Sequence, residues 1–168
     1  MKRILLMMLA MLAFGVHDIQ AQDAPLKIVT NHPDFKIKVK RCAASGKTVI
    51  LDLILTNEGA NDVDRVIAFG GHPGNSNEIP AEAYDDQGNI YQGDCIKVKV
   101  ANRSEYRIWD TGYFSILTGV PMRLSVSIEG VPANAESIAR LKMGIYCSAW
   151  NLNESKPILF RNIPISRD

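Results

Sequence analysis

The chain has 168 residues, with 19 Lys and Arg against 18 Asp and Glu, which gives a formal net charge of +1 at pH 7. Such a balance provides no general attraction to nucleic acid or to an anionic membrane surface. The length suits one domain with a self-sufficient core.

Residues 1–21 predict a secretory signal peptide. Two basic residues precede the apolar run Ile4 to Val16, and Ile19-Gln20-Ala21 follows as the expected cleavage region, which ends in a small residue. The apolar run is shorter than the ~20 residues that a membrane-spanning helix needs. We therefore expect a periplasmic or secreted protein with no integral membrane segment after signal cleavage.

Residues 22–34 are predicted as an N-terminal extension and residues 35–168 as one β-rich domain. Phe35 to Lys40 alternates apolar and charged residues, which indicates a half-buried strand with a solvated lysine face. Thr48 to Thr56 is almost entirely apolar or β-branched, as in a central strand, and Asn57 to Asp62 ends it with turn residues. These two segments predict a hairpin.

Further strands are expected along the rest of the chain, with a single helical turn at 133–138. They lie at 63–69, 83–91 (two strands around the turn Asp86 to Asn89), 96–100, 122–128, 139–147 and 158–165. Seven to nine short strands without alternating helices predict an all-β, antiparallel β-sandwich. Its unequal loops, long near 70–80 and 102–112, favour Greek-key connections.

Several of these segments together resemble a known group of domains. They are the signal peptide, Leu55 to Gly59, Asp85 to Tyr91, Gly119-Val120-Pro121 and Phe160 to Ile165. The pattern resembles a family of small exported immunoglobulin-like domains of unknown function, common in Bacteroides-type bacteria. The resemblance covers about residues 35–165. It implies an immunoglobulin-like sandwich with an extracytoplasmic role and provides no catalytic or ligand residues.

The alternation of apolar and charged residues in each strand predicts which face each of the three cysteines occupies. Cys42 is predicted on the lysine face of the strand at 35–40, and Cys95 on the lysine face of the strand at 96–100. Cys147 is in phase with the apolar residues of its own strand. Because an exported chain with three cysteines allows one bridge, the phase predicts a Cys42–Cys95 disulfide and a buried Cys147 thiol. Intermolecular pairing is the competing interpretation.

The acidic turn offers a weak metal site. Asp85, Asp86, Asn89 and Asp94 carry hard oxygen ligands that suit Ca²⁺. Their spacing does not match an EF-hand loop, and acidic turn residues occur in any antiparallel protein. A structural turn is therefore the main interpretation, with calcium as the alternative and no cofactor expected.

The sequence contains no recognised catalytic motif, such as a Gly-x-Ser-x-Gly elbow or a His-Glu-x-x-His helix. A hydrolase built from scattered carboxylates remains the runner-up, because sandwich folds can place paired acids that are distant in sequence. The acids considered are Asp64, Glu78, Glu82 and Glu105.

The segment 106–114 is the preferred candidate for function. Its four aromatic residues, Tyr106, Trp109, Tyr113 and Phe114, are of the kind that recognises sugars or protein partners. In the alternative interpretation, Trp109 and Phe114 belong to the core and the tyrosines rim the sheet. We expect an exported, non-catalytic binding or interaction module for an unknown protein or glycan. A secreted hydrolase and a purely structural accessory domain are the alternatives.

Overall fold

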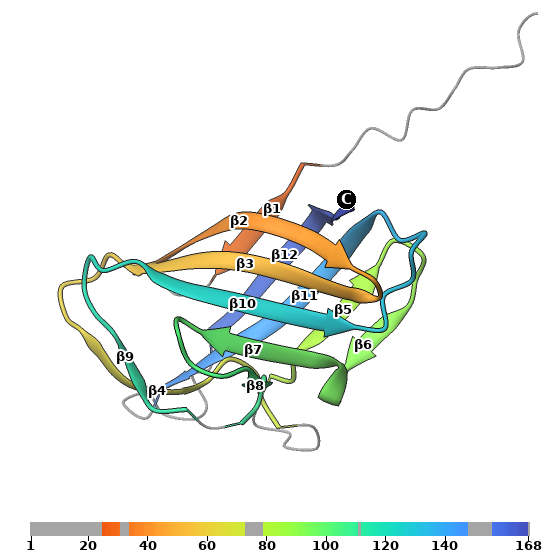
Figure 1. The fold of residues 1–168 in the computed structure, drawn as a ribbon. Coiled ribbons are helices and arrows are strands. Elements are labelled where there is room, and N and C mark those ends of the chain that lie inside the picture. Colours follow the sequence, from red (N-terminus) through yellow and green to blue (C-terminus); the bar gives the residue numbers. More distant parts are fainter. Residues whose placement is uncertain (1–24, 31–33, 73–78, 111, 148–155, 168) are drawn as a thin grey trace, which may run out of the picture.

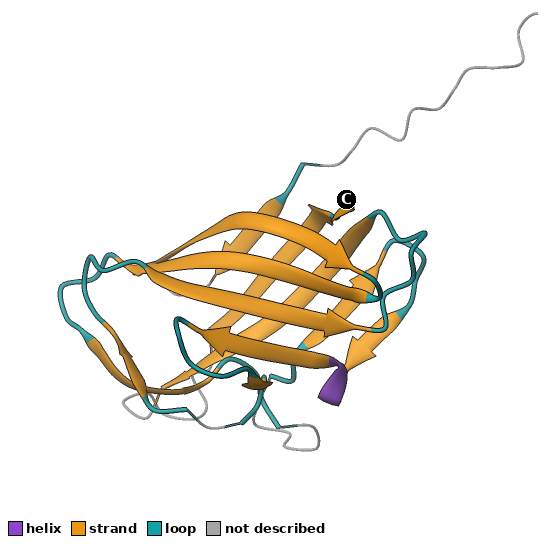
Figure 2. Ribbon diagram, in the orientation of Figure 1, coloured by secondary structure: helices purple, strands orange, loops and turns teal. Residues whose placement is uncertain are grey.

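The computed structural model of the chain describes residues 25–30, 34–72, 79–110, 112–147 and 156–167. The predicted signal peptide therefore lies outside the described residues. Among the described residues, strands account for nearly all of the regular structure, and a short 3₁₀ turn, η2 (Gly93–Cys95), precedes β7 (Figure 2). The strands are β1 (Lys27–Thr30), β2 (Phe35–Ser45), β3 (Thr48–Asn57), β4 (Val63–Ala68), β5 (Glu82–Asp85), β6 (Ile90–Gln92), β7 (Ile96–Val100), β8 (Tyr106–Arg107), β9 (Phe114–Ile116), β10 (Met122–Glu129), β11 (Ser137–Cys147), β12 (Lys156–Pro164) and β13 (Ser166–Arg167).

The strands form two sheets that pack face to face (Figure 1). The six-stranded sheet has the order β13-β2-β3-β10-β7-β8. The seven-stranded sheet has the order β1-β12-β11-β4-β9, with β5 paired to both β11 and β6. The prediction of an all-β, antiparallel sandwich is confirmed. Non-consecutive neighbours such as β3 and β10 show that the chain crosses between the sheets.

The predicted number of strands was too low, and the predicted helical turn at 133–138 was wrong. Strands β1, β8, β9 and β13 have two to four residues each, too few to show an alternating pattern. Strand β1 pairs with β12, so the sandwich already includes part of the predicted N-terminal extension. Residues 133–134 form a turn, and β11 begins at Ser137.

The core lies between the two sheets, and strand β3 shows how the sequence builds it. Val49, Leu51, Leu53 and Leu55 are each at most 2% exposed, whereas the residues between them are half-buried on the outer face. Apolar residues of β11 and β12, among them Phe160, close the core from the opposite sheet. Because side chains alternate between the two faces of a strand, each outer-face position in β3 is fixed by its buried neighbours.

A β-bulge in β2 reverses the phase on which the disulfide prediction depended. Val39 pairs with Leu53 and Arg41 pairs with Asp52, so Lys40 is an extra residue in the ladder. After the bulge Cys42 faces the core and is 7% exposed. Burial, and then the charge of Asp52, raise the pKa of the Cys42 thiol to about 12.

The predicted Cys42–Cys95 disulfide is wrong. Both cysteines are free thiols, and Cys95 is exposed in η2 next to β7. Strands β2 and β7 are separated by β3 and β10, which at ordinary strand spacing is about 14 Å, twice the ~7 Å limit for bridging two Cα atoms. The side chain of Cys147, predicted as a buried thiol, lies outside the described part of the chain.

No helix among the described residues has the length and apolar character that crossing a membrane would require.

Candidate binding site

A hollow of about 540 Å³ lies on the outer face of the six-stranded sheet. Its position follows from the strand alternation, since Leu53 and Leu124 face the core and their neighbours face outwards. Side chains of β2, β3, β7 and β10, together with the turn after β7, surround it. The lining residues are Lys40, Asp52, Leu53, Ile54, Lys99, Ala101, Asn102, Pro121, Arg123, Leu124 and Ser125.

The register of the sheet brings these distant residues together. Ser125 on β10 lies opposite Asp52 on β3 and opposite Lys99 on β7. Two residues before Ser125 on β10, and on the same face, Arg123 lies opposite Ile54 of β3. Residues that are about 25 to 70 positions apart in the sequence therefore form adjacent rows on one surface.

Asp52 is held in the floor of this hollow by two hydrogen bonds. The Arg41 Nε donates to Oδ2 over 3.2 Å, and the Ser125 hydroxyl donates to Oδ1 over 2.6 Å. Arg41 also forms the ion pair with this carboxylate. A carboxylate has about four lone-pair sites, so Asp52 can still accept from a ligand.

Three cations at the hollow have no such partner. The side chains of Lys40, Lys99 and Arg123 form no ion pair or hydrogen bond with any side chain that the structure describes. On the same face, by contrast, Lys97 pairs with Glu129. The hollow therefore carries a local excess of positive charge in a chain whose overall charge is balanced.

A second hollow of about 440 Å³ adjoins the first. The two share four lining residues, Ala101, Asn102, Pro121 and Arg123. We call the two hollows together the groove. The second hollow is more apolar, and its other lining residues are Val100, Arg103, Phe114, Ser115, Leu117, Val120 and Met122.

The turn between the two hollows has an uncommon backbone conformation. Ala101 has a φ of 49°, in the left-handed region that residues other than glycine seldom adopt. Two hydrogen bonds hold it there: the Ala101 N–H donates to the Arg123 carbonyl over 2.9 Å, and the Arg103 N–H donates to the Val100 carbonyl over 3.0 Å. This turn places Asn102 where it lines both hollows.

Asn57 fixes the opposite wall of the second hollow. This residue is 1% exposed, and its Nδ2 donates to the Ile116 carbonyl over 3.3 Å. Its backbone carbonyl accepts from the Gly119 N–H over 2.7 Å. The turn after β9, which includes the half-exposed Leu117 and Val120, is thereby attached to the end of β3.

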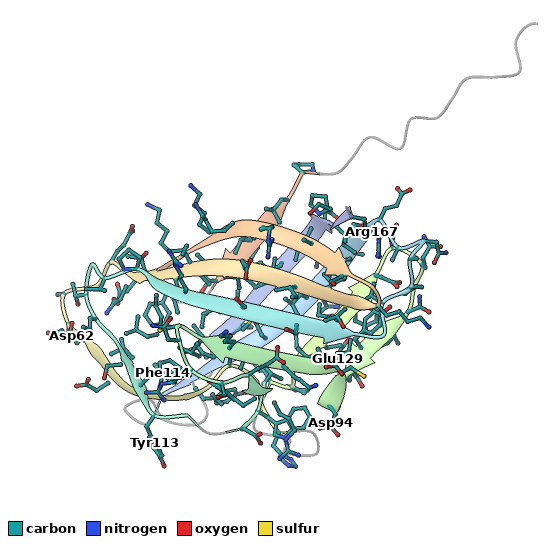
Figure 3. The ribbon with its side chains drawn as sticks, in the orientation of Figure 1. Asp62, Asp94, Tyr113, Phe114, Glu129 and Arg167 are labelled. Carbon is teal, nitrogen blue, oxygen red and sulfur yellow. The ribbon has the colours of Figure 1, made fainter. Side chains whose placement is uncertain are left out.

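The four aromatic residues predicted as a binding surface do not lie on one exposed face. Tyr113 is 69% exposed and projects away from the sheets, whereas Phe114 turns towards them (Figure 3). Phe114 stacks on the fully buried Phe69 with ring centroids 5.4 Å apart and also lines the second hollow. Tyr106 and Trp109 are partly buried and pack against the core. Phe114 is thus the member of this set that reaches the groove.

Trp109 lies at the surface among polar and charged groups. The Arg107 guanidinium sits over its ring at 5.7 Å from the centroid, and the His72 ring meets it edge-on at 6.3 Å. Arg107 in turn donates from Nε to Asp110 over 3.0 Å. One side of the indole is therefore already covered by a cation, which leaves less of the ring for a ligand than the sequence suggested.

The acidic turn joins β5 and β6, and its buried carboxylate is used inside the turn. Asp85 is 3% exposed and accepts hydrogen bonds from the N–H groups of Gln87 and Asn89, from the Asn89 side chain and from the Tyr91 hydroxyl. Burial raises the pKa of Asp85, but these hydrogen bonds outweigh it and hold the pKa below its ordinary value of 3.8.

The other residues of the weak calcium alternative have separate contacts. Asp86 accepts from the Glu136 N–H, and Asp94 lies on η2, where it is 3.9 Å from Arg107 (Figure 3). Within the described ranges, no group of three or more His, Cys, Asp or Glu could hold a metal ion. The interpretation of Asp85 to Asn89 as a structural turn thus rests on the hydrogen bonds that Asp85 accepts within it.

The carboxylates considered for a hydrolase are dispersed. Asp64 is on β4 and Glu82 on β5 in one sheet, whereas Glu105 precedes β8 in the other and accepts a hydrogen bond from Ser127. Glu78 lies outside the described residues. None of the three described acids lines the groove, where Asp52 is the one acid among the described lining residues.

Sequence patterns missed most of the groove. In the sequence, Lys40 and Lys99 stand out only as parts of the solvated lysine faces of their strands, and no motif marks Asp52, Asn102 or Arg123. The available signal was the charge on outward positions of predicted central strands, such as Asp52 within an otherwise apolar segment. Grouping those positions requires the strand order, which periodicity does not provide.

Comparisons with known proteins assign no family. No protein-family model matches the sequence, and no curated protein matches it. Among solved structures, the chain is similar to a family 123 glycoside hydrolase from Clostridium perfringens, described in a structural analysis of glycolipid glycan hydrolysis. The two are 10% identical with a TM-score of 0.39, over 86% of this chain and 27% of that chain. The chain thus spans about a quarter of that enzyme's length, and so slight a likeness carries no argument about function.

Proposed function

We propose that the protein is an exported, non-catalytic binding module that takes its ligand, a glycan or a protein, in the groove on the six-stranded sheet. Export rests on the predicted signal peptide at 1–21. The observation that carries the binding role is the pair of adjoining hollows, of about 540 and 440 Å³, which share the turn at Ala101 and Asn102.

The shape and lining of the groove support binding. Ligand sites are concave surfaces that combine apolar area with a few placed polar groups. Here Phe114, Val120 and Met122 supply the apolar part, while Asn102 and Ser125 supply hydrogen-bonding groups. The walls are parts of a rigid framework, because β3 and β10 are paired on both sides.

The distribution of acids supports a non-catalytic role. A glycosidase needs two carboxyl groups about 5 to 9.5 Å apart across its cleft. Among the described residues that line the groove, Asp52 is the one acid, and Arg41 and Ser125 hold it. The groove therefore supports recognition more directly than hydrolysis.

A blocking variant tests this proposal. Asn102 is exposed on a turn and lines both hollows, so Asn102→Trp fills the groove without disturbing a strand. The purified protein is screened against immobilised glycans and defined proteins, and bound ligands are titrated against wild type and variant. We expect affinity to fall at least about tenfold in Asn102→Trp.

Two further variants separate the groove from other surfaces. Gln87→Trp adds the same side chain at an exposed turn position in the β5–β6 hairpin, and we expect it to bind like wild type. Trp109→Ala examines the alternative surface at 106–114. A ligand that is lost in Trp109→Ala but retained in Asn102→Trp would place binding at the aromatic segment and contradict the groove.

A further inference from the structure

We infer that the ligand of the groove is an acidic polysaccharide, that is, a sugar chain bearing carboxylate or sulphate groups; this inference rests on the proposed binding function. The observation behind it is the set of cations around the groove. Lys40, Lys99 and Arg123 line the first hollow, and Arg103 lines the second.

These cations are available to an anion. None of the four forms an ion pair with a described residue, although neighbouring pairs such as Lys36 with Glu58 show that this face does contain acids. Arg103 is held over the Phe114 ring, 5.8 Å from the centroid, and its charge is left without a carboxylate partner in the described chain. An elongated surface with four cations and one acid is complementary to a ligand that carries repeated negative charge.

The neutral groups in the groove favour a sugar over a simple polyanion. Asp52 is an acceptor in the floor of the first hollow, with lone pairs remaining beyond its bonds to Arg41 and Ser125. A ligand that meets Asp52 must therefore donate hydrogen bonds, as hydroxyl groups do and as sulphate or carboxylate groups alone do not. Asn102, which lines the same hollow, can both donate and accept.

The apolar part of the groove fits the same ligand. Leu117 and Val120 are 45% and 50% exposed, and with Phe114 they form a surface against which the C–H face of a sugar ring can pack. Because the two hollows share their central residues, one chain can contact the cations of the first and the apolar wall of the second.

The backbone of the sheet disfavours an acidic peptide. A peptide commonly binds a sheet by adding a strand to an open edge, through main-chain hydrogen bonds. The first hollow lies over β3 and β10, whose backbone groups are paired with neighbours on both sides, so recognition there depends on side chains. A polysaccharide requires only side-chain contacts.

Titration with defined probes tests the inference. The probes are polygalacturonate for carboxylate, dextran sulphate for sulphate, uncharged dextran, poly-L-glutamate as the acidic peptide and phosphatidylglycerol vesicles as the anionic lipid. We expect at least one acidic polysaccharide to bind at least about tenfold more tightly than dextran, poly-L-glutamate and the vesicles, and more weakly as salt increases.

Variants matched in charge locate the site. We expect Lys99→Ala/Arg123→Ala to reduce affinity for the acidic polysaccharide about tenfold or more. Lys27→Ala/Lys47→Ala removes two exposed cations from β1 and the β2–β3 turn and should leave affinity within about twofold. Circular dichroism melts establish that each variant is folded.

The outcomes separate this inference from the proposed function. Equal losses in the two double variants would indicate unspecific charge attraction and overturn the inference, as would poly-L-glutamate or vesicle binding as tight as that of the glycans. Equally tight binding of dextran would overturn it while leaving the binding module intact. If no acidic polysaccharide binds but another ligand is lost in Asn102→Trp, the inference alone fails. If no ligand at all depends on Asn102, both fail.

Discussion

The acidic turn of the β5–β6 hairpin and the cationic groove on the six-stranded sheet differ in whether their charged side chains have partners within the protein. In the turn, the buried Asp85 accepts four hydrogen bonds from residues within six positions of it. In the groove, Lys99 and Arg123 have no charged partner in the described chain. A charge satisfied by its own loop stabilises the fold, whereas a charge left without a partner is available to another molecule.

The largest expected effect is in the turn. Asp85→Asn keeps the size of the side chain but removes two acceptor sites and points an amide at the Tyr91 hydroxyl and the Asn89 amide. We expect the free energy of unfolding to fall by about 2–3 kcal/mol, because buried donors lose a charged acceptor. Urea unfolding followed by circular dichroism measures it. Asp94→Asn, on the exposed η2, is the control, and equal stability of the two variants would contradict the role given to Asp85.

The pH dependence of stability provides a second measure of how much the partners of Asp85 contribute to the fold. The pKa of Asp85 is lower in the folded protein than its ordinary value of 3.8. Its contribution to stability is therefore fully present well above pH 3.8 and is lost as the pH falls below that value through the lower pKa of the folded state. We expect wild type to lose stability more steeply than Asp85→Asn between about pH 5 and pH 2. Parallel loss in both proteins would place the acid sensitivity elsewhere.

Asp52 is the intermediate case, a carboxylate with internal partners inside the groove. In Asp52→Asn the amide oxygen can still accept a hydrogen bond from Arg41 or from Ser125. The Asp52 side chain is also 32% exposed, so water can replace part of what is lost. We expect a loss of about 0.5–1 kcal/mol in the free energy of unfolding. Thermal and urea unfolding of wild type and variant give the value. A loss as large as that of Asp85→Asn would show that Asp52 is chiefly a structural residue.

The smallest effect on stability is expected from the unpartnered cations. Lys99→Ala/Arg123→Ala removes no internal ion pair, so the free energy of unfolding should change by no more than about 0.5 kcal/mol. The same urea titration measures it. A loss of several kcal/mol would mean that these side chains support the sheet, and the comparison between the two regions would no longer hold.

The parts of the fold that could be predicted are those set by local alternation. The β2–β3 hairpin and the turn after Asp85 follow directly from the residues at 35–57 and 83–91. The bulge at Lys40 could not be predicted, because nothing in the residues of this strand marks which of them lacks a partner on β3. Its effect is nevertheless large, since it moves Cys42 from the outer face of the strand to the core face. That shift removes the phase argument for the cysteine pairing, and the two strands between β2 and β7 exclude the pairing independently.

The groove was beyond prediction for a different reason. It combines Lys40, Asp52, Lys99 and Arg123 from four strands, and their adjacency depends on β10 lying between β3 and β7. Strand order is a property of long-range packing, which no single segment encodes. The aromatic segment was conspicuous in sequence, yet Phe114 turns inward to stack on Phe69 and only Tyr113 is largely exposed.

The bulge in β2 also bears on the behaviour of the protein at high concentration. Beyond Ala43 and Ala44, which pair with the short β13, the outer edge of β2 has no neighbour among the described strands. An open edge can pair with the edge of another molecule and begin aggregation, and a bulge together with exposed lysines prevents this. Deleting Lys40 would restore a regular ladder and remove one charge, and so make this edge a template for intermolecular sheet growth.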